Sequence, residues 1–178
     1  MIIASIHPEK PVEGPAGSAQ IQIRKMQEND LNIVEQIEQS CFPEPWPVTI
    51  FRENLHRSPV VCNWVAENEE RIVGFLIAWY IPRYVKEAGE IHIHNIAVDP
   101  LYWRQGIGKR LLYTATTEGI QRNCDVLILE VRESNTGAQS FYRRYGFTRV
   151  GSRQSYYGTE DALVMEASTQ NILQLLKQ

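Results

Sequence analysis

Hydrophobic and polar residues follow two different periods along the first part of the chain, and each change of period marks a predicted element. Residues 21–26 (IQIRKM) alternate apolar and polar side chains, which is typical of a strand. After Asn29 or Asp30, which can cap a helix, apolar residues recur at every third or fourth position up to Cys41. This spacing predicts a helix, which the prolines of residues 41–47 (CFPEPWP) end, and a short second helix is expected over about residues 48–56.

Strands and helices then alternate to the end of the chain. Residues 60–81 predict a hairpin with its turn at 68–70, and residues 89–98 a strand that Asp99-Pro100 stops. The remaining predicted elements are a helix at 106–122, a strand at 125–131, a helix at 135–145 ended by Gly146, and two closing strands. The order predicts a single-domain α/β fold with a mixed sheet flanked by helices. We expect a flexible leader over residues 1–20, the domain at 21–167 and a helical tail at 168–178.

Composition narrows the class of protein. The chain has 178 residues, 43% of them hydrophobic and 22% charged, and a net charge of -3, which indicates a globular domain without the basic surface of a nucleic-acid binder. No apolar run reaches membrane-spanning length, and the first residues lack the features of a signal peptide. Three cysteines without C-x-x-C spacing favour neither disulfides nor zinc, so a reducing cytoplasm is expected.

Residues 103–109 (WRQGIGK) predict an anion site at the start of a helix. Gly106 and Gly108 lack a Cβ, so a diphosphate could approach the backbone N–H groups closely, and Arg104 and Lys109 add positive charge. The segment is neither a dinucleotide fingerprint nor a P-loop. The alternative is a helix start with two turn glycines.

Glu130 is the first candidate for catalysis. Alternation along VLILEVR places it on one strand face with Val126 and Ile128. A carboxylate on an apolar face is unfavourable unless it is paired or lies at a rim, and burial makes a carboxylate a better proton acceptor near neutrality. The alternative is an exposed Glu130 at the strand end that pairs with Arg132 or another base.

Tyr142 is the second candidate, on a predicted helix with Phe141 and Tyr145. Such a stripe of aromatic residues is also typical of simple packing against a sheet. The whole stretch from Leu129 to Phe147, however, fits the long pattern LEVRxSNxxAxxxYxxxGF without a gap.

With these motifs the chain resembles the GNAT superfamily of N-acetyltransferases, and over residues 21–166 its RimI-like branch of ribosomal-protein-alanine N-acetyltransferases. The resemblance implies a GNAT fold and acetyl-CoA as co-substrate, with Glu130 as proton acceptor and Tyr142 as proton donor. It also implies that the following residues contact the co-substrate: Ile96, Ala97 and Val98 through their main chain, Arg104, Gln105, Gly106, Ile107, Gly108 and Lys109 around the diphosphate, and Asn135. Trp103 departs from the family pattern Q/R-x-x-G-x-G/A, which has Gln or Arg at that place.

Two aromatic segments are candidate walls for the acceptor. The proline-rich stretch carries Phe42, Glu44 and Trp46, and prolines make it stiff; Tyr156 and Tyr157 are candidates for the opposite lip. The alternative for the first segment is a rigid loop that buries both aromatic rings. Glu90, His92 and His94 share one strand face, but two histidines at i and i+2 lack a partner set, so no metal is expected, and His94 is a possible accessory base.

The resemblance implies transfer of acetyl from acetyl-CoA to the N-terminal α-amine of a protein, most simply the N-terminal alanine of a small-subunit ribosomal protein. An N-terminal amine has a pKa of about 7.7–8.0, so deprotonating it at neutral pH costs only about 1 kcal/mol. Two alternatives remain open: the same chemistry on a small-molecule amine, and a non-catalytic subunit that only binds acyl-CoA. The sequence carries no signal for an oligomeric state, a nucleic-acid partner or a membrane partner.

Overall fold

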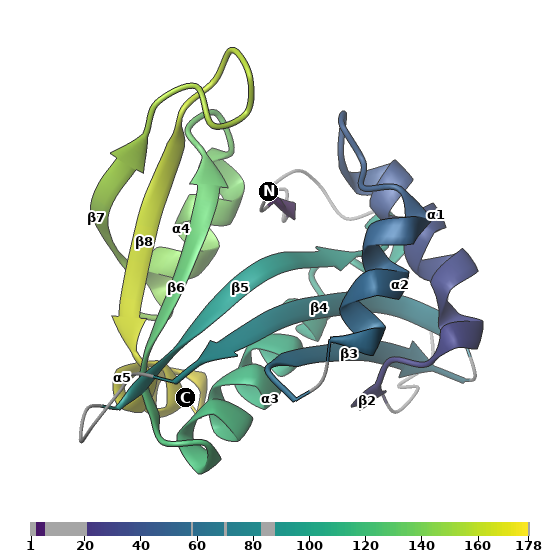
Figure 1. The fold of residues 1–178 in the computed structure, drawn as a ribbon, viewed down its shortest axis with the longest axis horizontal. Helices are drawn as coiled ribbons and strands as arrows, with labels where there is room; N and C mark the ends of the chain where they lie inside the picture. The colour runs from purple at the N-terminus through teal and green to yellow at the C-terminus, as the bar shows by residue number, and fades with distance from the viewer. Residues whose placement is uncertain (1–2, 6–20, 58, 70, 83–87, 178) are drawn as a thin grey trace.

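The structure is a computed structural model that describes residues 3–5, 21–57, 59–69, 71–82 and 88–177 (Figure 1). Its strands are β1 (Ile3–Ser5), β2 (Gln22–Lys25), β3 (Val61–Asn68), β4 (Arg71–Ile81), β5 (Gly89–Val98), β6 (Cys124–Arg132), β7 (Thr148–Arg153) and β8 (Ala162–Ser168). Its helices are α1 (Leu31–Cys41), α2 (Val48–His56), α3 (Ile107–Gln121), α4 (Thr136–Arg144) and α5 (Thr169–Leu176), with short 3-10 turns at Glu28–Asp30 and Pro100–Tyr102. The elements predicted between residues 21 and 167 match these bounds to within a few residues, whereas the leader lies, apart from β1, outside the described residues.

The strands form one mixed sheet in the order β2-β3-β4-β5-β6-β8-β7, and β1 pairs with β5 beside this path. Neighbouring strands are antiparallel except at β5–β6 and β1–β5, which are parallel. The predicted single-domain fold with a mixed, mostly antiparallel sheet and flanking helices is therefore confirmed.

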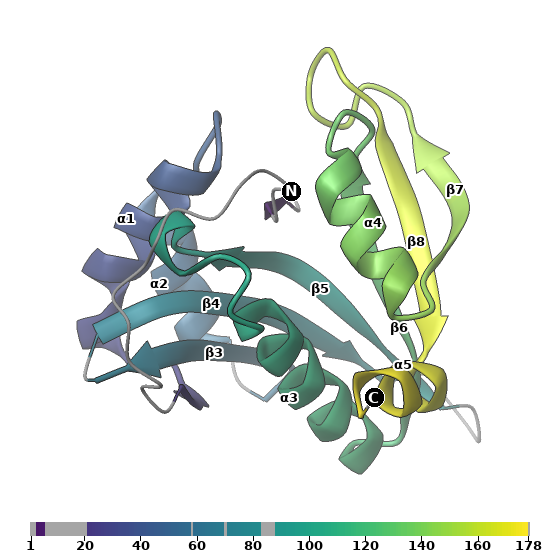
Figure 2. The ribbon, with the colours of Figure 1, turned by 180° about the vertical axis from the view of Figure 1, so that it is seen from behind.

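Helices cover both faces of the sheet. Figures 1 and 2 show α1 and α2 on one face and α3, α4 and α5 on the other. Each face has its own buried cluster: Leu31, Val34, Phe51 and Phe75 belong to the first, whereas Leu111, Leu129 and Tyr142 belong to the second. Each helix packs its apolar face against one of these two clusters. This packing fixes the ends of the helices and strands, and therefore the positions of the loops that connect them.

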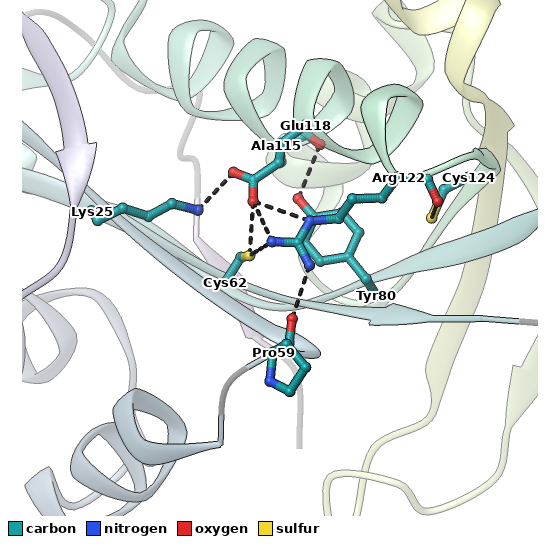
Figure 3. A network of polar contacts seen from close by, with 8 residues as sticks. All are labelled: Lys25, Pro59, Cys62, Tyr80, Ala115, Glu118, Arg122 and Cys124. Atoms are coloured by element: carbon teal, nitrogen blue, oxygen red, sulfur yellow. Dashed lines mark hydrogen bonds and ion pairs between the residues drawn. The ribbon is translucent and has the colours of Figure 1, made fainter.

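A polar network fixes the C-terminal half of α3 (Figure 3). Glu118 accepts hydrogen bonds from Lys25 of β2 at 2.6 Å and from Arg122 at 2.7 Å, and Arg122 also donates to the Pro59 carbonyl at 2.8 Å. The thiol of Cys62 lies 3.1 Å from Glu118, and burial raises its pKa to about 11, so it stays protonated. The network joins β2, β3 and α3, and it anchors the helix whose other end forms the predicted anion site.

All three cysteines are free thiols. Within the part of the chain that is described, none of the helices is both long enough and apolar enough to cross a membrane.

Candidate active site

The sheet splits between β5 and β6. The parallel ladder between them runs from Gly89 to Ile93 and goes no further, and a register shift in the β4–β5 pairing leaves His94 as an extra residue at the same point. Beyond the split, the edge of β5 from Asn95 to Ala97 pairs with β1. This is the edge at which the resemblance expects a pantetheine arm, and it can evidently pair with an added strand, as an amide-rich arm requires.

The anion site lies next to the split. Gly106 begins α3 with a φ of +77°, and a Cβ built there would meet nothing within 4 Å. In the described chain no side chain caps this helix, and its first turn carries no acidic residue, so its N–H groups are available to an anion. A cavity of about 280 Å³ opens here, lined by Val98, Tyr102, Trp103, Arg104, Gly106, Ile107, Gly108, Lys109, Gly137, Ser140, Phe141, Arg144 and Tyr145. An open backbone cradle with basic side chains fits the diphosphate of acetyl-CoA.

Most of the predicted co-substrate residues contribute to this region. Gln105 is an exception, because it is exposed and does not line the cavity. Ile96 and Ala97 are buried in β5. Asn135 caps α4, where its side chain accepts a hydrogen bond from the Ala138 N–H at 3.0 Å. One face of α4 was missed: Gly137, Ser140, Phe141 and Arg144 line the cavity. Their spacing of i, i+3, i+4 and i+7 marks one helix face and could have identified them.

Trp103 takes a structural part that the family pattern does not suggest. Its indole Nε1 donates a hydrogen bond of 2.7 Å to the Val98 carbonyl, and the Cys41 thiol donates to the same oxygen at 3.3 Å. The Val98 carbonyl is therefore already occupied at the end of β5. Trp103 fixes the turn between β5 and α3 and also lines the cavity.

Glu130 is buried in the split, with 2% of its surface exposed. The alternative of an exposed Glu130 is therefore wrong, but its expected ion pair with another base is present, because Oε1 lies 2.9 Å from Arg153 of β7. The sequence did not single out Arg153. Oε2 has no hydrogen-bond partner among the described residues, so this carboxylate could accept a proton there.

Tyr142 is fully buried on α4, where it packs against Phe141 and Phe147. Burial raises its pKa above the ordinary value, so the phenol remains protonated and has a proton to donate. Its hydroxyl also lacks a partner in the described part of the protein.

The predicted acceptor lips lie at one end of the molecule, in the α1–α2 loop and the β7–β8 loop (Figure 1). Phe42, Trp46 and Tyr157 are buried, so the packing alternative for the two loop aromatics agrees with the structure, and their part in binding stays a prediction. Tyr156 is half-buried, whereas Glu44 is 63% exposed and pairs with Arg132. A second cavity, of about 520 Å³, lies under the α1–α2 loop and is lined by Glu44, Pro45, Trp46, Pro47, Ile50, Glu53, Asn54, Arg57, Trp79 and His94.

The histidine face lies beside this cavity. His94 packs on Trp79 with ring centroids 4.4 Å apart, and His92 lies 3.3 Å from Glu90. Burial, helped by His92, lowers the pKa of His94 to about 3, so His94 is neutral near pH 7 and a weak base. In the described residues no three metal-binding side chains come together.

Glu38 is a functional candidate that the sequence reasoning missed. It is fully buried on α1, and its two oxygens accept hydrogen bonds of 3.0 Å from the Trp46 N–H and the Asn95 side chain. Burial raises the pKa of Glu38 to about 7, although both hydrogen bonds oppose this. Glu38 follows Val34 by four residues and so lies on the apolar face of α1, and this spacing could have predicted that its carboxylate is buried. Glu38 therefore ties the α1–α2 loop to β5 beside the split.

Comparison with known proteins agrees with this geometry. Residues 31–147 match the acetyltransferase (GNAT) family. The chain is 32% identical over 145 residues to the putative ribosomal protein bS18-alanine N-acetyltransferase of Bacillus subtilis (strain 168), a match that covers 80% of this chain and 92% of that protein. It is 33% identical over 147 residues to the ribosomal protein bS18-alanine N-acetyltransferase of Escherichia coli (strain K12), with coverages of 80% and 94%. The crystal structure of the Escherichia coli ribosomal-protein-S18-alanine N-acetyltransferase matches with a TM-score of 0.73 at 31% identity, covering 84% of this chain and 94% of that one.

The chain therefore belongs to the GNAT family and is an acetyl-CoA-dependent N-acetyltransferase. Within the family, the relatives just described are named as alanine N-acetyltransferases of a ribosomal protein, bS18.

Proposed function

We propose that this protein transfers acetyl from acetyl-CoA to the N-terminal α-amine of a protein, and that the acceptor is the N-terminal alanine of a small-subunit ribosomal protein. The names of the relatives at 32% and 33% identity support this acceptor. An acceptor on the ribosome would place the enzyme in the cytoplasm. The single observation that carries the chemistry is that Glu130 Oε2 and Tyr142 OH are both among the buried polar atoms of the described residues that have no hydrogen-bond partner.

Acetyl-CoA supplies an activated acyl group in the form of a thioester. In the proposed reaction the acceptor nitrogen forms a bond to the acetyl carbon while the carbon–sulfur bond breaks. Glu130 takes the proton that the amine loses, directly or through a water molecule, and Tyr142 gives a proton to the departing sulfur. About a tenth of an N-terminal amine is already neutral at pH 7, so one carboxylate suffices for this acceptor, whereas a lysine amine would need about 4–5 kcal/mol.

Burial raises the pKa of Tyr142, the proposed acid, and the sequence could not show this. The raised pKa of Tyr142 makes it a weaker acid than a free phenol, so proton transfer to the sulfur must be driven by charge that develops on the sulfur. The hydroxyl has no competing partner among the described residues, which leaves it available for that charge. The rest of the acceleration comes from holding the amine and the thioester in line at the split.

Initial rates of thiol release from acetyl-CoA test the proposal. We expect turnover with a hexapeptide that begins with alanine, and turnover at least tenfold lower in kcat/KM with the same peptide blocked at its N-terminus but carrying an internal lysine. Free polyamines serve as the third arm. Faster turnover with a polyamine than with any alanine-starting peptide would favour the small-molecule alternative and contradict the proposal.

A further inference from the structure

Arg132 occupies the end of β6, two residues after Glu130 and on the same face of the strand. Only 15% of its side chain is exposed. Its Nη2 lies 3.0 Å from Glu44 of the α1–α2 loop, and its Nη1 lies 3.1 Å from Glu160 of the β7–β8 loop. One guanidinium thus contacts both predicted lips of the acceptor site.

Further contacts hold this guanidinium in place. It lies over the ring of Tyr157, 4.1 Å from the centroid, which is favourable for a cation above an aromatic face. Glu160 also accepts a hydrogen bond of 2.6 Å from the Ser134 N–H. Burial alone would raise the pKa of Glu160, but the hydrogen bonds from Ser134 and Arg132 outweigh it and lower the pKa. The side of Arg132 facing the β7–β8 loop is therefore built rigidly.

The other side is built loosely. Glu44 is 63% exposed, and an ion pair with such a carboxylate contributes little to stability. The Nε–H of Arg132 is buried and has no hydrogen-bond partner in the described chain. Buried donors in proteins are completed by the protein, by a ligand or by water, so this donor is open to a ligand that enters between the lips. A donor at this place matches a main-chain carbonyl beyond the first residue of an extended peptide, an acceptor that a simple amine or alaninamide lacks.

We propose that Arg132 is a positioning residue that bridges the two lips over the acceptor, and that it thereby favours a peptide over a small amine. The proposal rests on the proposed function and names the class of acceptor more closely. The bridge leaves the chemistry at Glu130 and Tyr142 unchanged, because in the described structure Arg132 makes its ion pairs with Glu44 and Glu160, whereas Glu130 pairs with Arg153. Its effect should therefore appear in KM for the peptide.

The test compares two acceptors, an alanine-starting hexapeptide and alaninamide, with wild type, Glu44→Gln, Arg132→Lys and Arg132→Gln. For Glu44→Gln we expect KM for the hexapeptide to rise about threefold to tenfold while kcat and KM for acetyl-CoA change less than about twofold. KM for alaninamide should not move. Arg132→Lys, which keeps the charge but has no planar fork, should fall between Glu44→Gln and Arg132→Gln.

A matched control and a double variant make the result specific. Glu28→Gln removes a carboxylate of similar exposure from the 2.6 Å pair with Arg52, which lies outside both cavities, and should leave every constant unchanged. Glu44→Gln combined with Arg132→Gln should be no worse than Arg132→Gln alone, because both break one link. Thermal unfolding identifies any variant that fails to fold. If the Arg132 variants do not fold, the KM of Glu44→Gln alone decides the proposal, because Glu44 is exposed and its substitution should not disturb the fold.

The possible failures are distinguishable. If wild type acetylates the hexapeptide but Glu44→Gln leaves its KM unchanged, or raises KM for alaninamide equally, the bridge is wrong and the proposed function stands. If wild type acetylates neither acceptor, the proposed function itself is wrong.

Discussion

The two sides of the split are built in different ways. The co-substrate side consists of backbone and one helix start, Gly106 to Lys109, with a face of α4 opposite. The acceptor side is held by side chains from distant parts of the chain: Arg132 bonds Glu44 across 88 positions, and Asn95 bonds Glu38 across 57. A site made of backbone can be identified from a short motif, whereas a site made of distant pairs becomes visible only when the chain is folded.

Tyr142→Phe should give the largest effect, because Tyr142 is the proposed proton donor of the reaction. We expect kcat to fall by about 10²–10⁴ while the Kd of acetyl-CoA barely changes, since only the proton donor is lost. Steady-state rates combined with equilibrium binding measure both quantities. Tyr113→Phe, at an exposed position on α3 outside the cavity, is the control and should keep its rate. A near-wild-type kcat for Tyr142→Phe would remove its role as an acid.

Glu38→Gln tests the acceptor side through the pH dependence of protein stability. Between pH 4.5 and about 7 the folded protein binds the Glu38 proton more tightly than the unfolded chain does, so the free energy of unfolding falls as pH rises through this window. The rise of this pKa from 4.5 to about 7 corresponds to a loss on the order of 3 kcal/mol. The variant lacks this proton, so its stability should depend less on pH.

The Gln variant can keep the geometry of the loop. Its carbonyl still accepts from the Trp46 N–H, and Asn95 can turn its amide over, because Asn95 Oδ1 has no partner in the described structure. Urea unfolding at pH 5, 6, 7 and 8 measures the difference between wild type and variant. A difference that stays constant over this range would show that Glu38 titrates as it does in the unfolded chain.

Gly106→Ala and Gly158→Ala compare the two sides directly. Both glycines have a positive φ, +77° and +76°, and in both a Cβ would meet nothing within 4 Å. Each substitution should therefore strain the backbone by about 1–2 kcal/mol. Only Gly106 lies in the anion cradle, so we expect the Kd of acetyl-CoA to rise about tenfold for Gly106→Ala and to stay unchanged for Gly158→Ala. Equal changes in Kd would mean that strain, and not the approach of the diphosphate, matters at Gly106.

The same contrast explains what could be predicted from the sequence. The elements and the sheet class follow from local periodicity, and two motifs were enough to propose the anion cradle and the pair of Glu130 and Tyr142. The ion pairs could not be predicted in this way. Arg153 pairs with Glu130, and Arg132 pairs with Glu44 of the α1–α2 loop, and in each pair the two residues lie far apart in the sequence. Nothing in their local pattern distinguishes them from solvated surface residues, because ion pairs depend on the final positions of β6, β7 and the loops.

The burial of particular side chains was only partly predictable from the sequence. Phe42, Trp46 and Glu38 all lie in or beside one loop, and the structure places all three in the interior. The two aromatics could equally have faced an acceptor, and the carboxylate could have faced solvent. The stiffness of the proline-rich loop was predicted, but which side it turns inward depends on α1, α2 and β5 together.

Removal of residues 1–20 should have the smallest effect of these changes. It tests whether β1 competes with acetyl-CoA for the edge of β5. β1 pairs with Asn95 to Ala97 of β5, the edge at which the resemblance expects the pantetheine arm. Strand and co-substrate cannot both pair with this edge, so the apparent Kd equals the intrinsic Kd divided by the fraction of molecules with the edge free. Because a three-residue strand is a weak competitor, we expect the Kd of acetyl-CoA to fall only about threefold on truncation, measured by calorimetry. Ala4→Pro, which removes one backbone N–H in the middle of β1, should reproduce part of this gain. An unchanged Kd in both variants would mean that β1 leaves the edge without cost, and the co-substrate side would then be as open in the full chain as in the truncated one.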